Sequence, residues 1–461
     1  MITIALPLAH GIGQIQDLPI PRWLFYYAAS LTLILSFVAL AVLWKEPRLS
    51  GHEAGRPLAD HWQRFLLWPG WRIICGGISF GLLVVVWLAA LFGQPDAGDN
   101  IAPVFIWVVF WLGLVPIVVL FGNVWTLLNP WSAAADGLAW AWAKLGRDWE
   151  PAARYPEWLG RWPAAVLFLA FATLELAWPR SAEPRTLALA IVLYSWITWA
   201  GMLIYGRRAW LQNGEAFAVY FGLLARISAF TVREEDGRRR AFVRPPLSGL
   251  VSGDSHPGTV AFVSVMLGSV AFDGLSRATW WQDQQYELEV RYIVESPTKA
   301  DFVSLGFNFV GLLVAVVAIG TMYSLAVYIA KRIGHTDVNL AGAFIGSLIP
   351  IALAYAVAHY FTLLVDAGQD TIFLASDPFG KGWDIFGTAD FQPTENVFGP
   401  NTIWYVQVGV LVVGHVLGLV LAHDKAIALF SSAQTAIRTQ YAMLALMVLY
   451  TCTGLWLLSS G

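Results

Sequence analysis

Two histidines and three acidic residues occur inside apolar stretches of this sequence, where ionisable side chains are rare. The stretch AYAVAHYFTLLVDAGQD holds His359 and Asp366, and His415 lies within LVVGHVLGL. Glu175 occurs in FATLELAW, and Asp273 occurs in SVMLGSVAFDGLS. Because an unpaired ionisable group at bilayer depth costs several kcal/mol, each of these five residues is a candidate functional group.

The spacing of these residues predicts that they lie at comparable depth. His359 precedes Asp366 by nearly two helical turns, so the two side chains share a face and His359 lies about 10 Å below the boundary. His415 lies about 18 Å from the start of its own stretch on the same scale. Glu175 and Asp273 lie near the ends of their stretches. We therefore expect the five groups to converge in the outer half of the membrane.

Imidazole and carboxylate groups that converge in this way favour binding of a divalent metal, Zn²⁺, Mn²⁺ or Fe²⁺. A bound metal lowers the pKa of a coordinated water and supplies a hydroxide nucleophile. We predict Asp273 and His359 as catalytic residues. The predicted metal ligands are His359, His415, Asp366, Asp273, Glu175 and His10, the last from the N-terminal segment AHGIGQIQDLPIP.

The same residues have other interpretations. A histidine inside the membrane often only hydrogen-bonds a neighbouring helix, and a carboxylate at a helix end can reach water at the headgroups. His359 and His415 would alternatively bind haem b, as in a haem- or metal-binding subunit of a larger membrane complex. A small-molecule transporter is a third alternative, because Pro116 and Asn129-Pro130 indicate a break near the inner end of one stretch.

The composition identifies the class of protein to which these residues belong. Of the 461 residues, 57% are hydrophobic and 13% are charged. Soluble domains contain about 25% charged residues, so the chain is predicted to be an integral membrane protein. We expect one all-α transmembrane bundle over residues 1–461, with lipid and an apolar small molecule as partners and no nucleic acid.

Ten stretches are long and apolar enough to be transmembrane helices, which need about 20 residues each. The seventh is long enough to tilt or to extend beyond the bilayer. The predicted stretches are 23–44, 73–92, 103–121, 163–178, 186–205, 258–275, 302–330, 340–365, 403–422 and 441–458.

Basic residues in the connections predict the orientation of the helices. If the N-terminus is outside, three quarters of the 28 Lys and Arg residues fall in inside loops. This bias follows the positive-inside rule, so both termini are predicted to face outward from the plasma or inner membrane.

Three connections are long enough to carry structure of their own. The outside loop 366–402 is rich in Gly, Pro and Asp and is predicted to be a lid. The inside loops 123–162 and 206–257 contain amphipathic stretches, which would lie along the inner interface or pack beneath the bundle. The run REEDGRRRAFVR in the second of these loops is interpreted as a solvated positive-inside segment.

Several strings resemble a known family. AHGIG with DLPIP, FGNVWTLLNPW, FVSVMLGSVAFDGLS, ALAYAVAHYF and GHVLGLVLAHD together resemble bacterial polytopic membrane proteins labelled fenitrothion hydrolase. The resemblance spans nearly the whole chain and implies cleavage of an organophosphorus triester at its P–O-aryl bond. Such a reaction needs a polarised phosphoryl oxygen and an activated water, both of which a metal supplies. The preferred prediction is therefore a membrane-embedded, metal-dependent hydrolase that acts on an apolar ester.

Overall fold

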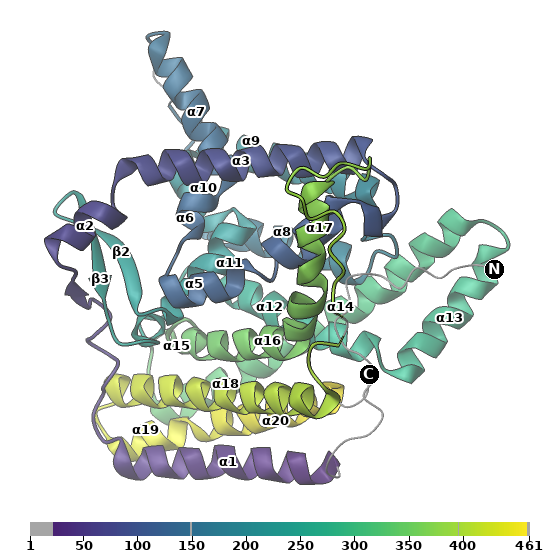
Figure 1. Cartoon of the computed structure of the whole chain (residues 1–461). Helices are drawn as coiled ribbons and strands as arrows, with labels where there is room; N and C mark the ends of the chain where they lie inside the picture. Colours follow the sequence, from purple (N-terminus) through teal and green to yellow (C-terminus); the bar gives the residue numbers. More distant parts are fainter. Residues whose placement is uncertain (1–21, 148–149, 395, 459–461) are drawn as a thin grey trace.

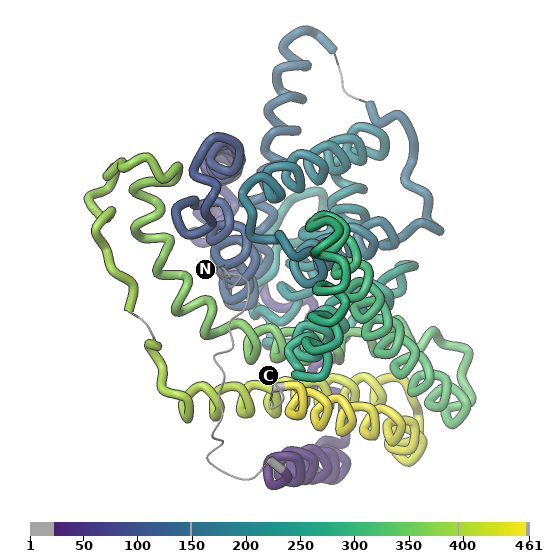
Figure 2. The backbone as a smooth tube through the Cα atoms, turned by 90° about the vertical axis from the view of Figure 1, so that its right-hand side faces the viewer, coloured from purple at the N-terminus to yellow at the C-terminus, as the bar shows by residue number. Residues whose placement is uncertain are grey.

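The computed structural model describes residues 22–147, 150–394 and 396–458. Within these residues, ten helical segments are long and apolar enough to cross a membrane. The segments pack side by side, as Figures 1 and 2 show. The predicted all-α polytopic fold with ten transmembrane helices is confirmed.

The spanning segments follow the order of the predicted stretches, and several contain more than one helix. They are α1 (Arg22–Leu43); α2 (Asp60–Leu66) with α3 (Pro69–Phe92); α4 (Ile101–Val104), the π-helical η2 (Phe105–Phe110) and α5 (Leu114–Phe121); η3 (Glu157–Leu159) with α8 (Trp162–Leu176); α9 (Pro184–Tyr205); α12 (Thr259–Ser276); α14 (Pro297–Gly334); α15 (Leu340–Phe344), η6 (Ile345–Leu348), α16 (Ile349–Asp366), η7 (Ala367–Gln369) and α17 (Asp370–Ser376); α18 (Pro400–Leu429); and α19 (Ala433–Thr439) with α20 (Tyr441–Leu458).

The remaining elements lie in the connections. They are β1 (Arg56–Pro57), η1 (Ala97–Asp99), α6 (Trp125–Leu128), α7 (Pro130–Lys144), α10 (Arg207–Asn213), α11 (Ala216–Leu224), η4 (Ala225–Ile227), β2 (Phe230–Glu235), β3 (Arg238–Val243), η5 (Ser248–Leu250) and α13 (Thr279–Ile293).

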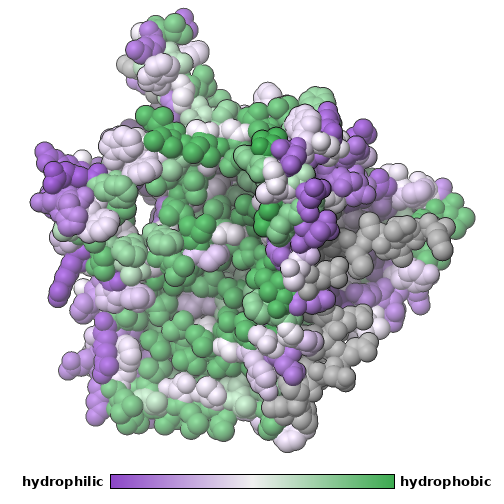
Figure 3. All heavy atoms as spheres, in the orientation of Figure 1, coloured by the Kyte–Doolittle hydropathy of each residue, from purple (hydrophilic) through white to green (hydrophobic). Residues whose placement is uncertain are grey.

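Successive spanning segments run in opposite directions, so the connections gather at two ends of the bundle. An apolar band crosses the middle of the molecule, and hydrophilic residues concentrate towards both margins (Figure 3). The connections at one end, which we call the basic end, are 44–59, 122–156, 206–258, 335–339 and 430–432.

Helix α12 is the most buried of the spanning helices, with 72% of its apolar window inside the structure. Its small residues allow this close packing. A Cβ atom on Gly268 would lie 2.6 Å from the Cα atom of Val316, and one on Gly320 of α14 would lie 2.9 Å from Ser264 Oγ. Small side chains therefore let α12 and α14 approach closely.

The two connections predicted to carry interfacial helices differ in the structure. Helix α7 projects from the bundle (Figure 1) and exposes Trp140 and Trp142. Helix α11 instead packs against α8 and α5 and is mostly buried. Glu215 caps α11 by accepting hydrogen bonds from the N–H groups of Phe217 and Ala218, each at 2.9 Å. Burial raises the pKa of the Glu215 carboxyl above its usual value.

The basic run interpreted as a loop forms a β-hairpin. Strands β2 and β3 pair antiparallel, and β1 adds to the free edge of β3. The turn is Asp236-Gly237, with positive φ angles of 51° and 71°. A two-residue Asp-Gly turn of this kind matches the twist of paired strands, which is the physical signal for the hairpin.

The segment after α1 is fixed to α18 at the basic end. Asp424 accepts hydrogen bonds from the backbone N–H groups of residues 48–50, at distances between 2.6 and 3.0 Å. It also accepts one from the Trp44 indole at 3.1 Å. His423 Nε2 lies 3.1 Å from the Trp44 carbonyl oxygen. Helix α1 packs on α18 and α20, far from α2 and α3 (Figure 1).

Candidate active site

Asp273 and His359 meet in the interior of the bundle, one from α12 and the other from α16. His359 Nε2 lies 2.7 Å from Asp273 Oδ2. His359 is 2% exposed and Asp273 is 0% exposed. The distance is that of a hydrogen bond, although the direction at the ring nitrogen departs from the ideal. The carboxylate favours the imidazole tautomer that carries its proton on Nε2.

Tyr360 connects this pair to Glu175 on α8. Its hydroxyl oxygen lies 2.7 Å from Asp273 Oδ2 and 3.5 Å from Glu175 Oε1. The phenol donates to Asp273 at an ordinary hydrogen-bond length, whereas the contact to Glu175 is at the limit of one. Glu175 is itself buried. Glu175, Tyr360, Asp273 and His359 therefore form a continuous polar chain across three helices.

Arg277 supplies a nearby cation. It follows Asp273 by one helical turn, and its Nε lies 3.5 Å from Asp273 Oδ1. The Arg277 side chain is 13% exposed. Burial of a carboxylate is costly unless the carboxylate is paired, and Arg277 and His359 both lie against Asp273.

The second ring nitrogen of His359 is open to chemistry. Within the described part of the chain, Nδ1 takes part in no hydrogen bond, while Nε2 faces Asp273. An imidazole that is protonated on Nε2 carries its basic lone pair on Nδ1. A carboxylate behind one nitrogen and a free lone pair on the other is the arrangement of a general base.

Two of the other predicted site residues, His415 and Asp366, lie elsewhere. His415 is fully buried, but its Nδ1 donates to the Leu411 carbonyl oxygen at 2.8 Å and its ring lies beside that of Tyr355. Asp366 ends α16, where its carboxylate accepts from the Val397 N–H at 3.4 Å in the loop predicted to be a lid. His10 lies outside the described residues.

The described residues do not assemble a metal site on their own. Among residues 22–147, 150–394 and 396–458, no three His, Cys, Asp or Glu side chains are placed to hold one ion. Catalytic zinc takes three protein ligands and structural zinc takes four. Of the six predicted ligands, Asp273 and His359 are in contact with each other. Glu175 lies on the far side of the Tyr360 hydroxyl.

Sequence reasoning missed Tyr360 and Arg277. Tyr360 directly follows His359, but adjacent residues on a helix point in different directions, so its contact with Asp273 was not evident. Arg277 lies just beyond the predicted stretch 258–275 and was therefore not considered with Asp273. Its spacing of four residues from Asp273 on a helix was the available signal for an ion pair.

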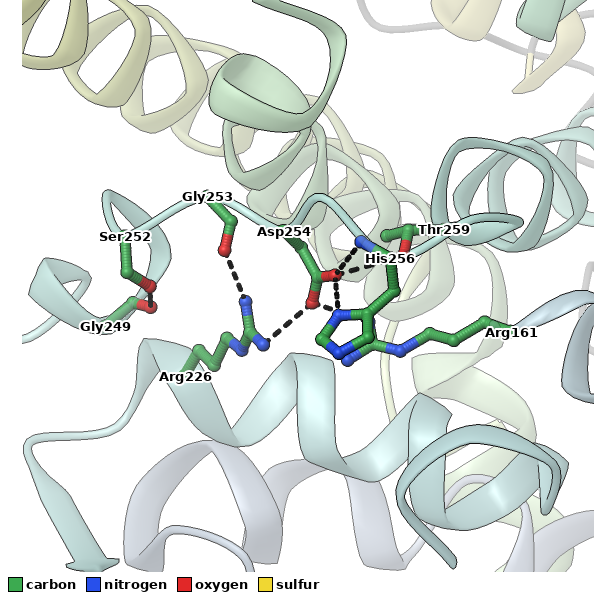
Figure 4. Close-up of polar contacts among 8 residues, drawn as sticks. All are labelled: Arg161, Arg226, Gly249, Ser252, Gly253, Asp254, His256 and Thr259. Atoms are coloured by element: carbon green, nitrogen blue, oxygen red, sulfur yellow. Dashed lines mark hydrogen bonds and ion pairs between the residues drawn. The ribbon is translucent and has the colours of Figure 1, made fainter. Parts of the chain in front are cut away.

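A second buried carboxylate, Asp254, lies at the basic end and is enclosed by cations (Figure 4). Arg161 lies 2.6 Å and Arg226 lies 2.8 Å from its Oδ2. The Oδ1 atom lies 2.8 Å from His256 Nδ1 and accepts from the Thr259 hydroxyl at 3.1 Å. Burial alone raises the pKa of Asp254, but Arg161, Arg226 and His256 outweigh it and lower the pKa to about 2.

Comparison with known proteins gives no assignment, because no protein-family profile, curated protein or solved structure matches the chain.

Proposed function

We propose that this protein is a membrane-embedded hydrolase of apolar esters, in which His359 is the general base. The observation that carries the proposal is the Asp273–His359 pair at 2.7 Å, whose imidazole keeps Nδ1 free of hydrogen bonds within the described residues. A buried pair of this kind in a transmembrane bundle is a functional site by default.

The chemistry follows from the two ring nitrogens. His359 Nδ1 accepts a proton from a water molecule while the water oxygen attacks the electrophilic centre of the ester. Asp273 stabilises the imidazolium that forms, and Tyr360 and Arg277 hold Asp273 in place. The bond to the leaving group breaks with its electron pair, and the imidazolium returns the proton to the leaving oxygen. Such acid–base catalysis contributes about 10²–10⁴-fold in rate.

The resemblance to the proteins labelled fenitrothion hydrolase indicates the substrate class. That resemblance implies a neutral organophosphorus triester whose P–O-aryl bond is cleaved. A neutral aryl ester partitions into lipid, which suits a site buried among transmembrane helices.

A neutral dialkyl p-nitrophenyl phosphotriester tests the proposal, because nitrophenolate release is visible by absorbance. We expect proteoliposomes of the purified chain to release nitrophenolate faster than empty liposomes. The His359→Gln variant should lose about 100-fold or more of this rate. The matched control is His415→Gln, another buried histidine outside the pair. Full activity in the His359 variant would exclude the general-base assignment.

Dependence on a divalent metal stays a prediction within this proposal. It requires at least one ligand beyond Asp273 and His359, and His10 is the residue predicted to supply it. Elemental analysis of the purified protein decides the matter, since a metal-dependent enzyme contains stoichiometric zinc, manganese or iron. The visible spectrum tests the haem alternative, for which a Soret band lost on His415→Ala is required.

A proton-coupled transporter is the second candidate, because the chain of Glu175, Tyr360, Asp273 and His359 resembles a proton relay. Two spanning segments are also irregular, one with the π-helical η2 and one with a 3₁₀ turn before α16. Irregular segments mark many transport sites. A pH-sensitive dye enclosed in vesicles reports proton entry. Acidification that the Asp273→Asn variant abolishes would favour transport if the native chain also shows no ester hydrolysis.

The proposed orientation places the basic end in the cytoplasm and both termini outside, by the positive-inside rule. Cysteine substitutions at Asp236 in the hairpin turn and at Asp384 in the predicted lid test it. A membrane-impermeant thiol reagent applied to intact cells should label the second and not the first.

A further inference from the structure

An arginine-lined cleft at the basic end is separate from the candidate active site. It lies between α2, β1 and β3 and encloses about 500 Å³. Arg64 of α2 lines one side, and Arg238, Arg239 and Arg240 of β3 line the other. In Figure 3 this end carries the hydrophilic residues seen at the left margin, where Figure 1 places α2 and the hairpin. The proposed hydrolase has no use for this cleft.

The walls of the cleft are held rigidly together. Gln63 of α2 donates to the Ala241 carbonyl oxygen at 2.8 Å and accepts from the Ala241 N–H at 2.8 Å. This pair of hydrogen bonds fastens α2 to the edge of β3. Residues 56–57 pair with the same strand. The two elements that carry the arginines are therefore held together by the fold rather than by a flexible loop.

The cleft carries an excess of positive charge. Arg240 is paired with Glu235 at 3.3 Å. Arg64, Arg238 and Arg239 take part in no ion pair within the described part of the chain, and Asp60 is the one carboxylate in the lining. The lining therefore has more positive than negative charge, which attracts an anion.

Exposed aromatic residues adjoin the cleft on α2 and at the start of α3. Trp62 is 51% exposed, Phe65 is 54% exposed and Trp68 is 52% exposed. These residues begin the second spanning segment, so they lie where the apolar band meets the polar end. Tryptophan is enriched at this level of a membrane, beside the headgroups.

We propose that the cleft binds the phosphate headgroup of an anionic phospholipid. Guanidinium groups match phosphate oxygens in two-point hydrogen bonds, and a phosphate would balance the excess charge. The neighbouring aromatic side chains would contact the glycerol and upper acyl region of the same lipid. Basic clusters beside a transmembrane helix are a known mode of anionic lipid recognition.

Native mass spectrometry of the purified full-length chain in detergent tests the proposal with dioctanoyl phosphatidic acid. The variant Arg64→Gln/Arg238→Gln/Arg239→Gln should weaken binding about tenfold or more. The matched control, Lys331→Gln/Arg332→Gln/Arg438→Gln, removes the same charge from exposed residues at the same end of the bundle and should change binding less than twofold. Replacement of the three cleft arginines by lysine should give an intermediate loss, because the charge stays and the fork geometry is lost.

Two results would overturn the proposal. Equal losses of phosphatidic acid binding in the cleft variant and in the control would mean that general surface charge attracts the lipid. Inorganic phosphate that displaces phosphatidic acid at equal concentration would show a site for the free anion instead of a lipid. Dioctanoyl phosphatidylcholine, whose phosphate is offset by choline, should bind at least tenfold more weakly than phosphatidic acid. None of these measurements depends on ester hydrolysis.

Discussion

Two carboxylates, Asp254 and Asp273, are similarly buried but have different surroundings. The Asp254 side chain is 1% exposed and the Asp273 side chain is 0% exposed. Asp254 has two arginines, a histidine and a hydroxyl around it, from η4 and from the starts of α8 and α12. Asp273 is paired with one arginine, Arg277, and shares the hydroxyl of Tyr360 with a second carboxylate, Glu175. Both belong to the same stretch of chain, only 19 residues apart.

The difference lies in the groups around each carboxylate. Two arginines lie against the single carboxylate of Asp254, so Asp254 stays ionised at neutral pH and joins three segments. Asp273 lies against one arginine and an imidazole, which is a group that can carry a proton. A carboxylate held by arginines fixes structure, whereas a carboxylate held against an imidazole can orient a group that exchanges protons.

The largest expected effect is on catalysis. Asp273→Asn removes the charge behind His359, so we expect hydrolysis of the phosphotriester to fall about 1,000-fold. The pH dependence of the residual rate should also change, because the imidazolium loses its counter-charge. A steady-state assay in proteoliposomes across pH measures both. Unchanged activity would contradict the role of Asp273.

The same substitution in the Asp254 cluster should lower the stability of the fold. Asp254→Asn leaves Arg161 and Arg226 buried without their counter-charge, which costs about 3 kcal/mol of folding free energy. Thermal unfolding in detergent measures this loss. The rate of ester hydrolysis per folded molecule should stay near that of the native chain. A large fall in this rate would mean that the Asp254 cluster also takes part in catalysis.

Acid should affect the Asp254 cluster in a defined range. The pKa of Asp254 is lowered to about 2 in the folded chain from a usual value of 3.8. Because the unfolded chain binds this proton more readily, the stabilisation is present above pH 4 and is lost as the pH falls towards 2. About 2 kcal/mol is expected. Melting curves between pH 4.5 and 2.5 should show a smaller decline for Asp254→Asn than for the native chain.

A smaller effect is expected from the phenol that connects the carboxylates. Tyr360→Phe keeps the ring but removes the hydrogen bond to Asp273, so activity should fall about tenfold. The loss should appear in kcat more than in KM, since Tyr360 acts through Asp273. An equal fall in melting temperature for this variant and for Asp254→Asn would instead indicate a purely structural role.

The smallest effect is expected for His415. Its Nδ1 bonds the Leu411 carbonyl oxygen of its own helix, and it is not joined to Asp273 by any contact in the described residues. His415→Gln should change hydrolysis less than twofold. A loss comparable with that of His359→Gln would mean that the site extends to α18.

The order and approximate bounds of the ten spanning helices could be predicted from the sequence, because apolar runs of bilayer length are a strong signal. The pairing of Asp273 with His359 was also predicted in outline, from matching depth on separate helices. The same reasoning could not exclude His415 from the site, because depth along a helix does not determine the direction in which a side chain points. That direction depends on the packing of α16 against α18.

The connections were harder to predict than the spans. Helix α11 was expected at the interface or beneath the bundle, and its burial against α8 and α5 distinguishes the two. The hairpin of β2 and β3 was missed because the segment was interpreted from its basic charge alone. The Asp236-Gly237 pair is typical of a two-residue hairpin turn. Tertiary contacts between distant segments decide such cases, and local sequence does not contain them.

The attachment of residues 48–50 to Asp424 bears on how the chain is assembled during synthesis. Helix α1 is translated long before α18 and α20, the helices against which it packs. It must therefore wait in lipid without these neighbours while some 400 residues follow. A ribosome that stalls before Asp424 leaves α1 without its docking partner.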